Sequence, residues 1–317
     1  EIMALPLGLS ERGKYTPLNA DSATNPERLL AIRGIKGRVW FADSTAAAGG
    51  NGASWTGAYT TIEAAVNAAA ADDTILVAPL HVERVSAAAG LELDKAGLTL
   101  IGFGNGNRRP QINFTTVVGA DMNVGSAGCT MINFRFTGGF DALTGPIDVN
   151  AADFTMVDCI TEDVTGQATD FIVTDATADR LTLIRWTHKG AAAAGADTAI
   201  TIVGGADITI EDAQIDGNFA VGCIENVTTA ATNLNIYGGM ERQCFMRTRN
   251  AADILVTLVA TSTGNVGPHI YGRLQDDAAN ITECIVGADM QFMNPIELVN
   301  ADGERSLLFN ATASADL

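Results

Sequence analysis

Apolar and polar positions alternate along most of this chain in short segments that recur about every 27 residues. Most segments place Thr or another polar residue between two apolar ones. The segments begin at Leu98, Cys129, Phe154, Leu181, Ile208, Leu234, Ile254, Ile281 and Leu307. A fixed period of roughly 20 to 50 residues indicates one supersecondary unit stacked on copies of itself.

A second strand-like segment precedes most copies. These segments begin at Pro146, Asp170, Ala199, Cys223, Cys244, Pro268 and Pro295. The turn between the two segments repeatedly ends in Asp, as at Asp153, Asp179, Asp207 and Asp253, and Asp suits a tight corner because it tolerates the left-handed conformation. Two or three strands per repeat, with no helical segment, predict one coil of a parallel β-helix.

Equal positions in stacked coils form columns. The first position is apolar in every copy and predicts an interior stack, whereas the Thr column should face outward because neighbouring strand residues point to opposite sides. The fourth column is also apolar on four rungs, at Ile101, Ile132, Val157 and Ile184. Two interpretations remain open for it: a bend that turns these residues inward, or an external stripe covered by another subunit.

The segment from 39 to 83 departs from the repeat and predicts a capping module. It contains a strand at Val39–Asp43, a Gly-rich loop, and helical periodicity from Thr60 to Ala71. Thr60 and Glu63 have the spacing of a capping box, and a buried strand at Asp73–Pro79 follows. A helix over the first coil would cover an open sheet end that otherwise invites aggregation.

These motifs resemble the N-terminal module of right-handed, pectate-lyase-like parallel β-helices. The matching segments are Trp40–Asp43, Gly52–Trp55, Ala58–Ile62, Ala64–Val66 and Asp73–Pro79. The resemblance implies a right-handed solenoid, a fold used by carbohydrate-active enzymes, phage tailspikes and phage head-decoration or cement proteins, so it indicates fold more than function. One departure is Leu80-His81-Val82-Glu83, where the family usually has Gly-x-Tyr-x-Glu.

The predicted organisation is an all-β chain with three parts: an extended N-terminal arm (1–38), a capping module with a short helix (39–83), and a single-stranded right-handed parallel β-helix (84–317). No apolar run reaches the roughly 18 residues that a membrane span needs. Five cysteines do not form a disulfide framework. Cys129, Cys159, Cys223 and Cys284 are expected as small core residues of a protein assembled in a reducing cytoplasm.

Charge divides the chain unevenly. The net charge is −18, and residues 1–38 carry six basic and four acidic side chains, so the remainder carries −20. An acidic body argues against nucleic-acid binding. The arm combines Leu and Ile with basic residues, which favours a segment that anchors on a larger platform over a disordered tail. Its basic residues are Arg12, Lys14, Arg28, Arg33, Lys36 and Arg38.

Carboxylates on two predicted outward columns are the candidates if the chain is an enzyme. The first column runs Asn133, Asp158, Arg185, Asp212, and the second runs Glu162, Lys189, Asp216, Arg242. Glycosidases need two carboxyls about 5 to 9.5 Å apart, one with a raised pKa. Asp158 and Asp212 would lie about 9.6 Å apart, and Arg185 between them would keep both ionised. The alternating charges instead indicate salt-bridge ladders.

Other chemistry has little support in the sequence. His188 is expected in a surface loop, and no Cys or His spacing suggests a metal or cofactor site. A lyase would need acids converging on calcium, and only scattered candidates exist. Among the repeat strands, Trp186 and Tyr237 are the aromatic residues expected to face outward and stack on a sugar.

The sequence therefore favours a non-catalytic structural protein of a phage virion, assembled in the host cytoplasm and located on the capsid exterior. We expect a homotrimer that decorates or cements the capsid through its arm, with the major capsid protein or another virion platform as partner. Neither nucleic acid nor membrane is expected as a partner, while glycan is possible. The alternatives are a tailspike-type polysaccharide depolymerase, acting through Asp158, Glu162, Asp212 or Asp216, and a glycan-binding adhesin.

Overall fold

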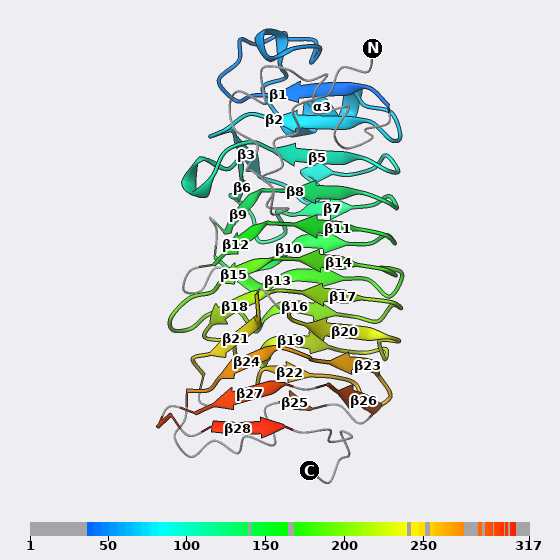
Figure 1. The fold of residues 1–317 in the computed structure, drawn as a ribbon. Helices are drawn as coiled ribbons and strands as arrows, with labels where there is room; N and C mark the ends of the chain where they lie inside the picture. The colour runs from blue at the N-terminus through cyan, green and yellow to red at the C-terminus, as the bar shows by residue number, and fades with distance from the viewer. Residues whose placement is uncertain are drawn as a thin grey trace, which may run out of the picture.

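The protein folds as a parallel β-solenoid of about eight turns, each of about 26 residues (Figure 1). This computed structural model describes residues 37–138, 141–163, 168–239, 242–250, 254–275, 285–286, 289–293, 295–300, 302–303 and 305–308. Three sheets run along its length, and each full turn contributes one strand to each sheet. The predicted all-β solenoid of right-handed type is confirmed.

Sheet I has ten strands: β1 (Val39–Ala42), β2 (Thr74–Val77), β5 (Thr99–Gly102), β8 (Thr130–Ile132), β11 (Thr155–Val157), β14 (Thr182–Ile184), β17 (Thr209–Glu211), β20 (Leu234–Tyr237), β23 (Thr263–Val266) and β26 (Asp289–Phe292). Sheet II also has ten: β3 (Val82–Val85), β6 (Gln111–Phe114), β9 (Arg135–Gly138), β12 (Ile160–Glu162), β15 (Thr187–Lys189), β18 (Gln214–Gly217), β21 (Cys244–Thr248), β24 (Ile270–Arg273), β27 (Ile296–Val299) and β28 (Arg305–Leu308). Sheet III has eight: β4 (Leu91–Glu92), β7 (Met122–Val124), β10 (Leu143–Val149), β13 (Ala168–Thr174), β16 (Thr198–Ile202), β19 (Gly222–Asn226), β22 (Val256–Thr257) and β25 (Ile285–Val286).

The predicted columns exist along most of sheet I. Residues of the Thr column are paired from strand to strand and half-buried, as expected for the outer face: Thr99, Thr130, Thr155, Thr182 and Thr209. The first column from Leu98 to Leu234 is buried inside the solenoid. Stacking of identical positions thus converts the sequence repeat into one continuous apolar core.

The predicted register is wrong after Leu234. The next strand of sheet I is β23, whose Gly264 pairs with Leu234, whereas the segment at Ile254 leads into β22 of sheet III. The segment at Ile281 likewise leads into sheet III, and the one at Leu307 lies in β28 of sheet II. The strands that begin at Cys244, Pro268 and Pro295 therefore belong to sheet II rather than beside the earlier members of their set.

The N-terminal end of the solenoid is closed by α3 (Ile62–Ala68), preceded by a short 3-10 turn, η1 (Trp55–Gly57). A second 3-10 turn, η2 (Gly106–Arg108), lies between sheets I and II. The N-cap of α3 is Thr61 and not the predicted Thr60, because the Thr61 hydroxyl accepts the Ala64 amide at 3.1 Å. The helix ends at Ala68, earlier than its periodicity suggests.

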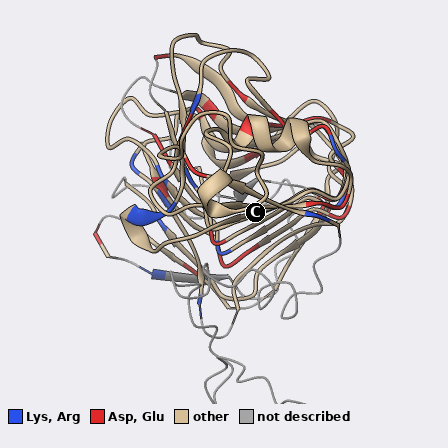
Figure 2. Ribbon diagram, turned by 90° about the horizontal axis from the view of Figure 1, so that it is seen from above, with Lys and Arg blue, Asp and Glu red and all other residues tan. Residues whose placement is uncertain are grey.

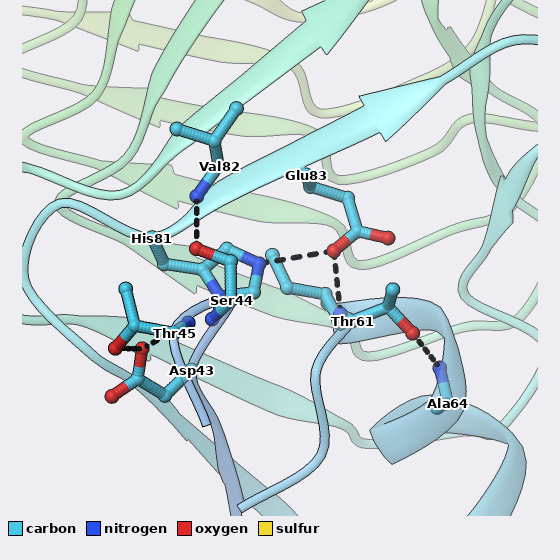
Figure 3. A network of polar contacts seen from close by, with 9 residues as sticks. Asp43, Ser44, Thr45, Thr61, Ala64, His81, Val82 and Glu83 are labelled. Atoms are coloured by element: carbon cyan, nitrogen blue, oxygen red, sulfur yellow. Dashed lines mark hydrogen bonds and ion pairs between the residues drawn. The ribbon is translucent and has the colours of Figure 1, made fainter. Parts of the chain in front are cut away.

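A buried His81–Glu83 pair holds the start of this helix (Figure 3). Glu83 Oε2 accepts the backbone amide of Ile62 at 2.6 Å and faces His81 Nε2 at 3.0 Å. The Ser44 amide donates to His81 Nδ1 at 2.9 Å, so a neutral His81 carries its proton on Nε2 and donates it to Glu83. His81 is thereby linked to the loop after β1 through Ser44, and to β3 and the start of α3 through Glu83.

Asp73 makes a second buried junction in the capping module. Its carboxylate accepts the Arg38 amide at 2.6 Å, the Trp40 indole at 2.8 Å and the Ala70 amide at 2.8 Å. Burial alone would raise the pKa of Asp73, but these hydrogen bonds outweigh it and lower that pKa. The first described strand is thus fixed to the residues that follow α3.

The C-terminal end of sheet II carries a strand that runs in the opposite direction. β28 pairs with β27 in antiparallel orientation, whereas the other strand pairs are parallel in the described part of the chain. In Figure 1, β28 lies beneath β27 at the bottom of the stack. This reversed strand ends the parallel stacking of sheet II, whereas β26 and β25 are the last described strands of sheets I and III. No described helix has the length and apolarity of a membrane span.

Candidate functional site

The first candidate column lies at the corner between sheets I and II. Asn133, Asp158, Arg185 and Asp212 all adopt positive φ angles, of 67°, 54°, 51° and 56°. This conformation favours Asn and Asp over other non-Gly residues, which explains three members of the column. The fourth, Arg185, forms a two-pronged ion pair with Asp158 at 2.6 and 2.8 Å, as the charge alternation predicts.

Asp212 and Arg242 complete this corner. Asp212 Oδ1 accepts the Gly239 amide at 2.5 Å, and Arg242 Nη2 donates to Thr187 Oγ1 at 3.3 Å. Burial lowers the pKa of Arg242, although Asp212 and Asp158 act in the opposite direction. Arg242 therefore belongs to the Asp158–Asp212 corner, and its predicted place in the second column is wrong.

The second column lies on the outer face of sheet II and runs Glu162, Lys189, Asp216, Arg247. Glu162 is bound by Arg135 at 2.6 Å and by Lys189 at 3.0 Å. Asp216 is bound by Arg247 and, at 2.9 Å, by Arg249.

Burial would raise the pKa of both carboxyls, but their basic partners outweigh it. They lower the pKa of Glu162 and bring that of Asp216 to about 2. A general acid must hold its proton near neutral pH, which requires a raised pKa. The ladder does the opposite, so Glu162 and Asp216 are held as ionised structural partners.

Two carboxyls with a raised pKa lie on or beside sheet III, outside both columns predicted from the sequence. Burial raises the pKa of Glu225, and the nearby Asp170 and Asp197 raise it further. Burial raises the pKa of Asp197 as well, with Asp170 as second cause. Asp170 accepts the hydroxyls of Thr198 and Thr201 at 2.9 and 3.0 Å. The sequence feature that could have identified this region is the acidic residues of the sheet III strands, which contain no Lys or Arg.

The aromatic candidates are placed differently from expectation. Trp186 is fully buried and donates its indole N–H to Thr161, so it is not an outward platform. Tyr237 is half-buried and donates to Glu211 at 3.3 Å. Phe245 and Tyr271 form an unpredicted outward stack on sheet II, with centroids 5.8 Å apart and planes at 14°.

His188 is a core residue, and its predicted loop position is wrong. It lies in β15, pairs with Thr161 and Ile215 on the neighbouring rungs, and is fully buried. Its Nδ1 lies 2.9 Å from Thr161 Oγ1, and Phe171 and Phe219 flank its ring at 5.5 and 5.6 Å. Burial lowers the pKa of His188 to about 3, so the ring is neutral.

The apolar fourth column faces outward but is covered in part by the chain itself. Ile101 is 1% exposed and packs in a cluster separate from the solenoid interior. Trp55 closes that cluster with edge-to-face contacts to Phe41 at 4.9 Å and Phe103 at 5.8 Å. Of the remaining candidates, Ile132 is buried in the same cluster, whereas Val157 and Ile184 are half-buried.

Most of the predicted anchoring arm lies outside the described residues, including Arg12, Lys14, Arg28, Arg33 and Lys36. Arg38 is described, and its guanidinium lies 3.9 Å from the centroid of the Trp40 ring. That position over an indole is a cation–π contact with the capping module. Arg38 thus belongs to the folded body, while its role in anchoring stays a prediction.

The described residues contain no cluster of His, Cys, Asp and Glu that could hold a metal ion. Cys129, Cys159, Cys223 and Cys244 are buried free thiols, and Cys284 lies outside the described residues. Burial raises the pKa of Cys129 to about 11 and that of Cys159 to about 12. These thiols are therefore inert core residues at neutral pH.

Comparison with known proteins adds no family to this picture. No known family model, no curated protein and no solved structure matches the chain.

Proposed function

We propose that this chain is a non-catalytic structural protein of a phage virion, a tailspike-like solenoid that decorates or cements the capsid exterior as a homotrimer. Its partners would be two further copies and the major capsid protein or another virion platform, reached through the N-terminal arm. Assembly would take place in the host cytoplasm.

The observation that carries the proposal is the pairing of the candidate carboxylates. Asp158 is bound by Arg185, Glu162 by Arg135 and Lys189, and Asp216 by two arginines. A surface built in this way supports a rigid rod rather than acid–base chemistry. The N-terminal end of that rod is covered by α3, and β28 adds a reversed strand to sheet II at the other end.

A virion reconstruction would test this proposal directly. Density for an eight-turn solenoid should appear at regular positions on the capsid, with its N-terminal end toward the shell. Finding the chain at the tip of a tail, or finding particles that lack it, would contradict capsid decoration.

A polysaccharide depolymerase is the second candidate, and one observation favours it. Asp197 and Glu225 have the raised pKa that a general acid needs. Incubation with capsular polysaccharide or lipopolysaccharide should then release oligosaccharides, and Glu225→Gln should abolish the release while Asp216→Asn leaves it intact. Product formation by the native chain would replace the structural proposal.

A further inference from the structure

Sheets II and III carry opposite charge on their outer faces. The strands of sheet II contain six basic residues: Arg84, Arg135, Lys189, Arg247, Arg273 and Arg305. Their acidic outward residues are Glu162, Asp216 and Glu297, so six basic minus three acidic side chains leave a net charge of +3. Arg135, Lys189, Arg247 and Arg305 pair with these acids, whereas Arg84 and Arg273 have no ion pair among the described residues. The strands of sheet III contain four acidic residues, Glu92, Asp148, Asp170 and Glu225, and no Lys or Arg. Charge complementarity of this kind steers and registers protein contacts.

The acidic side chains of sheet III lack counter-charges within their own sheet. Burial raises the pKa of Asp148, and Asp175 adds to it even though Asn150 donates a hydrogen bond. Glu225 and Asp197 are raised for the same reasons. An approaching basic surface would therefore relieve unfavourable interactions that the isolated chain retains.

Some exposed apolar side chains lie on sheet II or in the loops that lead to and from it. The large hydrophobic residues that are exposed in the described chain are Leu80, Val82, Val117, Val118 and Met293. Val82 lies in β3, Leu80 lies in the loop before it, Val117 and Val118 lie between β6 of sheet II and β7 of sheet III, and Met293 lies between β26 of sheet I and β27 of sheet II. The Phe245–Tyr271 stack lies on the same sheet. Aromatic residues and arginine are the groups enriched where proteins bind one another.

We infer that sheet II of one copy packs against sheet III of the next copy around a threefold axis parallel to the solenoid. The inference rests on the proposed trimer and names the surfaces that build it. Sheets II and III are different faces of the chain, so a contact of one with the other is head-to-tail, and the threefold axis of the proposed trimer closes it into a ring. A second copy is favoured over a foreign partner because the chain carries both complementary faces.

An axis parallel to the solenoid keeps the turns level, so each strand of sheet II faces the same turn of sheet III. Arg84 on β3 then faces Glu92 on β4, and Arg135 on β9, which also binds Glu162, faces Asp148 on β10. Lys189 on β15 faces the turn that carries Asp197. The view from above in Figure 2 shows charged positions along the periphery of the coils, where such contacts would form.

Charge reversal tests this arrangement by light scattering of the full chain. The wild type should have three times the chain mass of 33.0 kDa. R84E/R273E alters exposed residues of sheet II, and E92R/E225R alters half-buried ones of sheet III; each should give a monomer. Combining all four changes should restore the trimer, because the charges are exchanged between faces. The control K95E/R180E makes two reversals outside both sheets and should stay trimeric.

The remaining outcomes separate this inference from the trimer itself. If both face variants stay trimeric while V157D/I184D yields monomers, the contact lies on sheet I, so the trimer stands and the inference fails. A four-fold variant that stays monomeric with native circular dichroism also overturns it. A monomeric wild type at micromolar concentration overturns the trimer and the inference together.

Discussion

The interior of the solenoid accepts polar groups where neighbouring rungs can bind them. Trp186 donates to Thr161 at 2.9 Å, and the same hydroxyl lies 2.9 Å from His188. Two adjacent coils therefore share one hydrogen-bonded group inside an otherwise apolar core. This environment keeps His188 neutral, because protonating its ring would place an unpaired cation among aromatic side chains.

His188 should make the fold sensitive to acid. Its pKa is about 3 in the folded chain against 6.5 in the unfolded one, so the unfolded chain binds more protons between these values. Stability contributed by the neutral ring is complete above pH 6.5 and is lost as pH falls toward 3. Urea unfolding at about pH 7 and about pH 4 should show a loss of up to about 3 kcal/mol.

The variant His188→Gln isolates this effect from the carboxyls that titrate nearby. It should be less stable at neutral pH but should lose less stability on acidification than the wild type. Equal pH dependence of the two chains would show that His188 does not contribute.

Asp216 offers a second measurement at a single side chain. It is bound by Arg247 and Arg249, and Asp216→Asn should lower the free energy of unfolding by about 1 to 2 kcal/mol at neutral pH. The folded pKa is depressed, so this contribution exists above 3.8 and disappears as pH falls through about 2. The control Asp153→Asn breaks an exposed pair with Arg180 and should cost less, because water screens it.

At the scale of elements, the columns are predictable from the sequence wherever each coil keeps its apolar–polar–apolar segment, although the steps between coils vary from 25 to 31 residues. The steps from Leu98 to Leu234 kept the columns in register. The register failed at β23, whose interior position is Gly264 rather than an apolar residue. A Cβ there would lie 2.0 Å from the Leu234 carbonyl oxygen, so close backbone approach requires Gly and removes the apolar signal.

The same loss of register explains why some residues of the candidate site could not be predicted from the sequence. Once the register is lost, Arg247 cannot be placed beneath Asp216, and Phe245 and Tyr271 cannot be recognised as stacked. His188 was a different failure, since Thr187 and Lys189 alternate with it across β15 and mark it as inward. Burial by loops, as at Ile101, depends on contacts distant in sequence that a repeat pattern does not encode.

The capping element should depend on Glu83. Glu83→Ala removes the acceptor of both the Ile62 amide and His81 Nε2, and unsatisfied buried donors cost about 1 to 3 kcal/mol each. Hydrogen exchange should therefore accelerate at Ile62 and through α3, while strands beyond β8 stay protected. Glu83→Gln keeps one acceptor oxygen and should have a smaller effect; unchanged exchange in the Ala variant would contradict the role of the pair.

At the scale of the whole molecule, the described core is complete without the first 36 residues. Buried apolar residues of the described chain extend from Trp40 to Val299, and α3 covers the N-terminal end of the solenoid. A chain starting at Gly37 should therefore retain its circular dichroism and its melting transition. On the proposed function it should lose attachment to capsids, measured by sedimentation with particles that lack the native protein. Loss of the fold in this truncated chain would show that the arm supports the body.

The two different ends also limit how the molecule can change in size. Eight turns at about 4.8 Å each give a rod about 38 Å tall, and neither α3 nor β28 depends on the number of coils between them. The length of the rod can thus change by the gain or loss of whole coils. The charge ladders add a parity rule: one inserted coil would set like charges beside each other, whereas two would preserve the alternation.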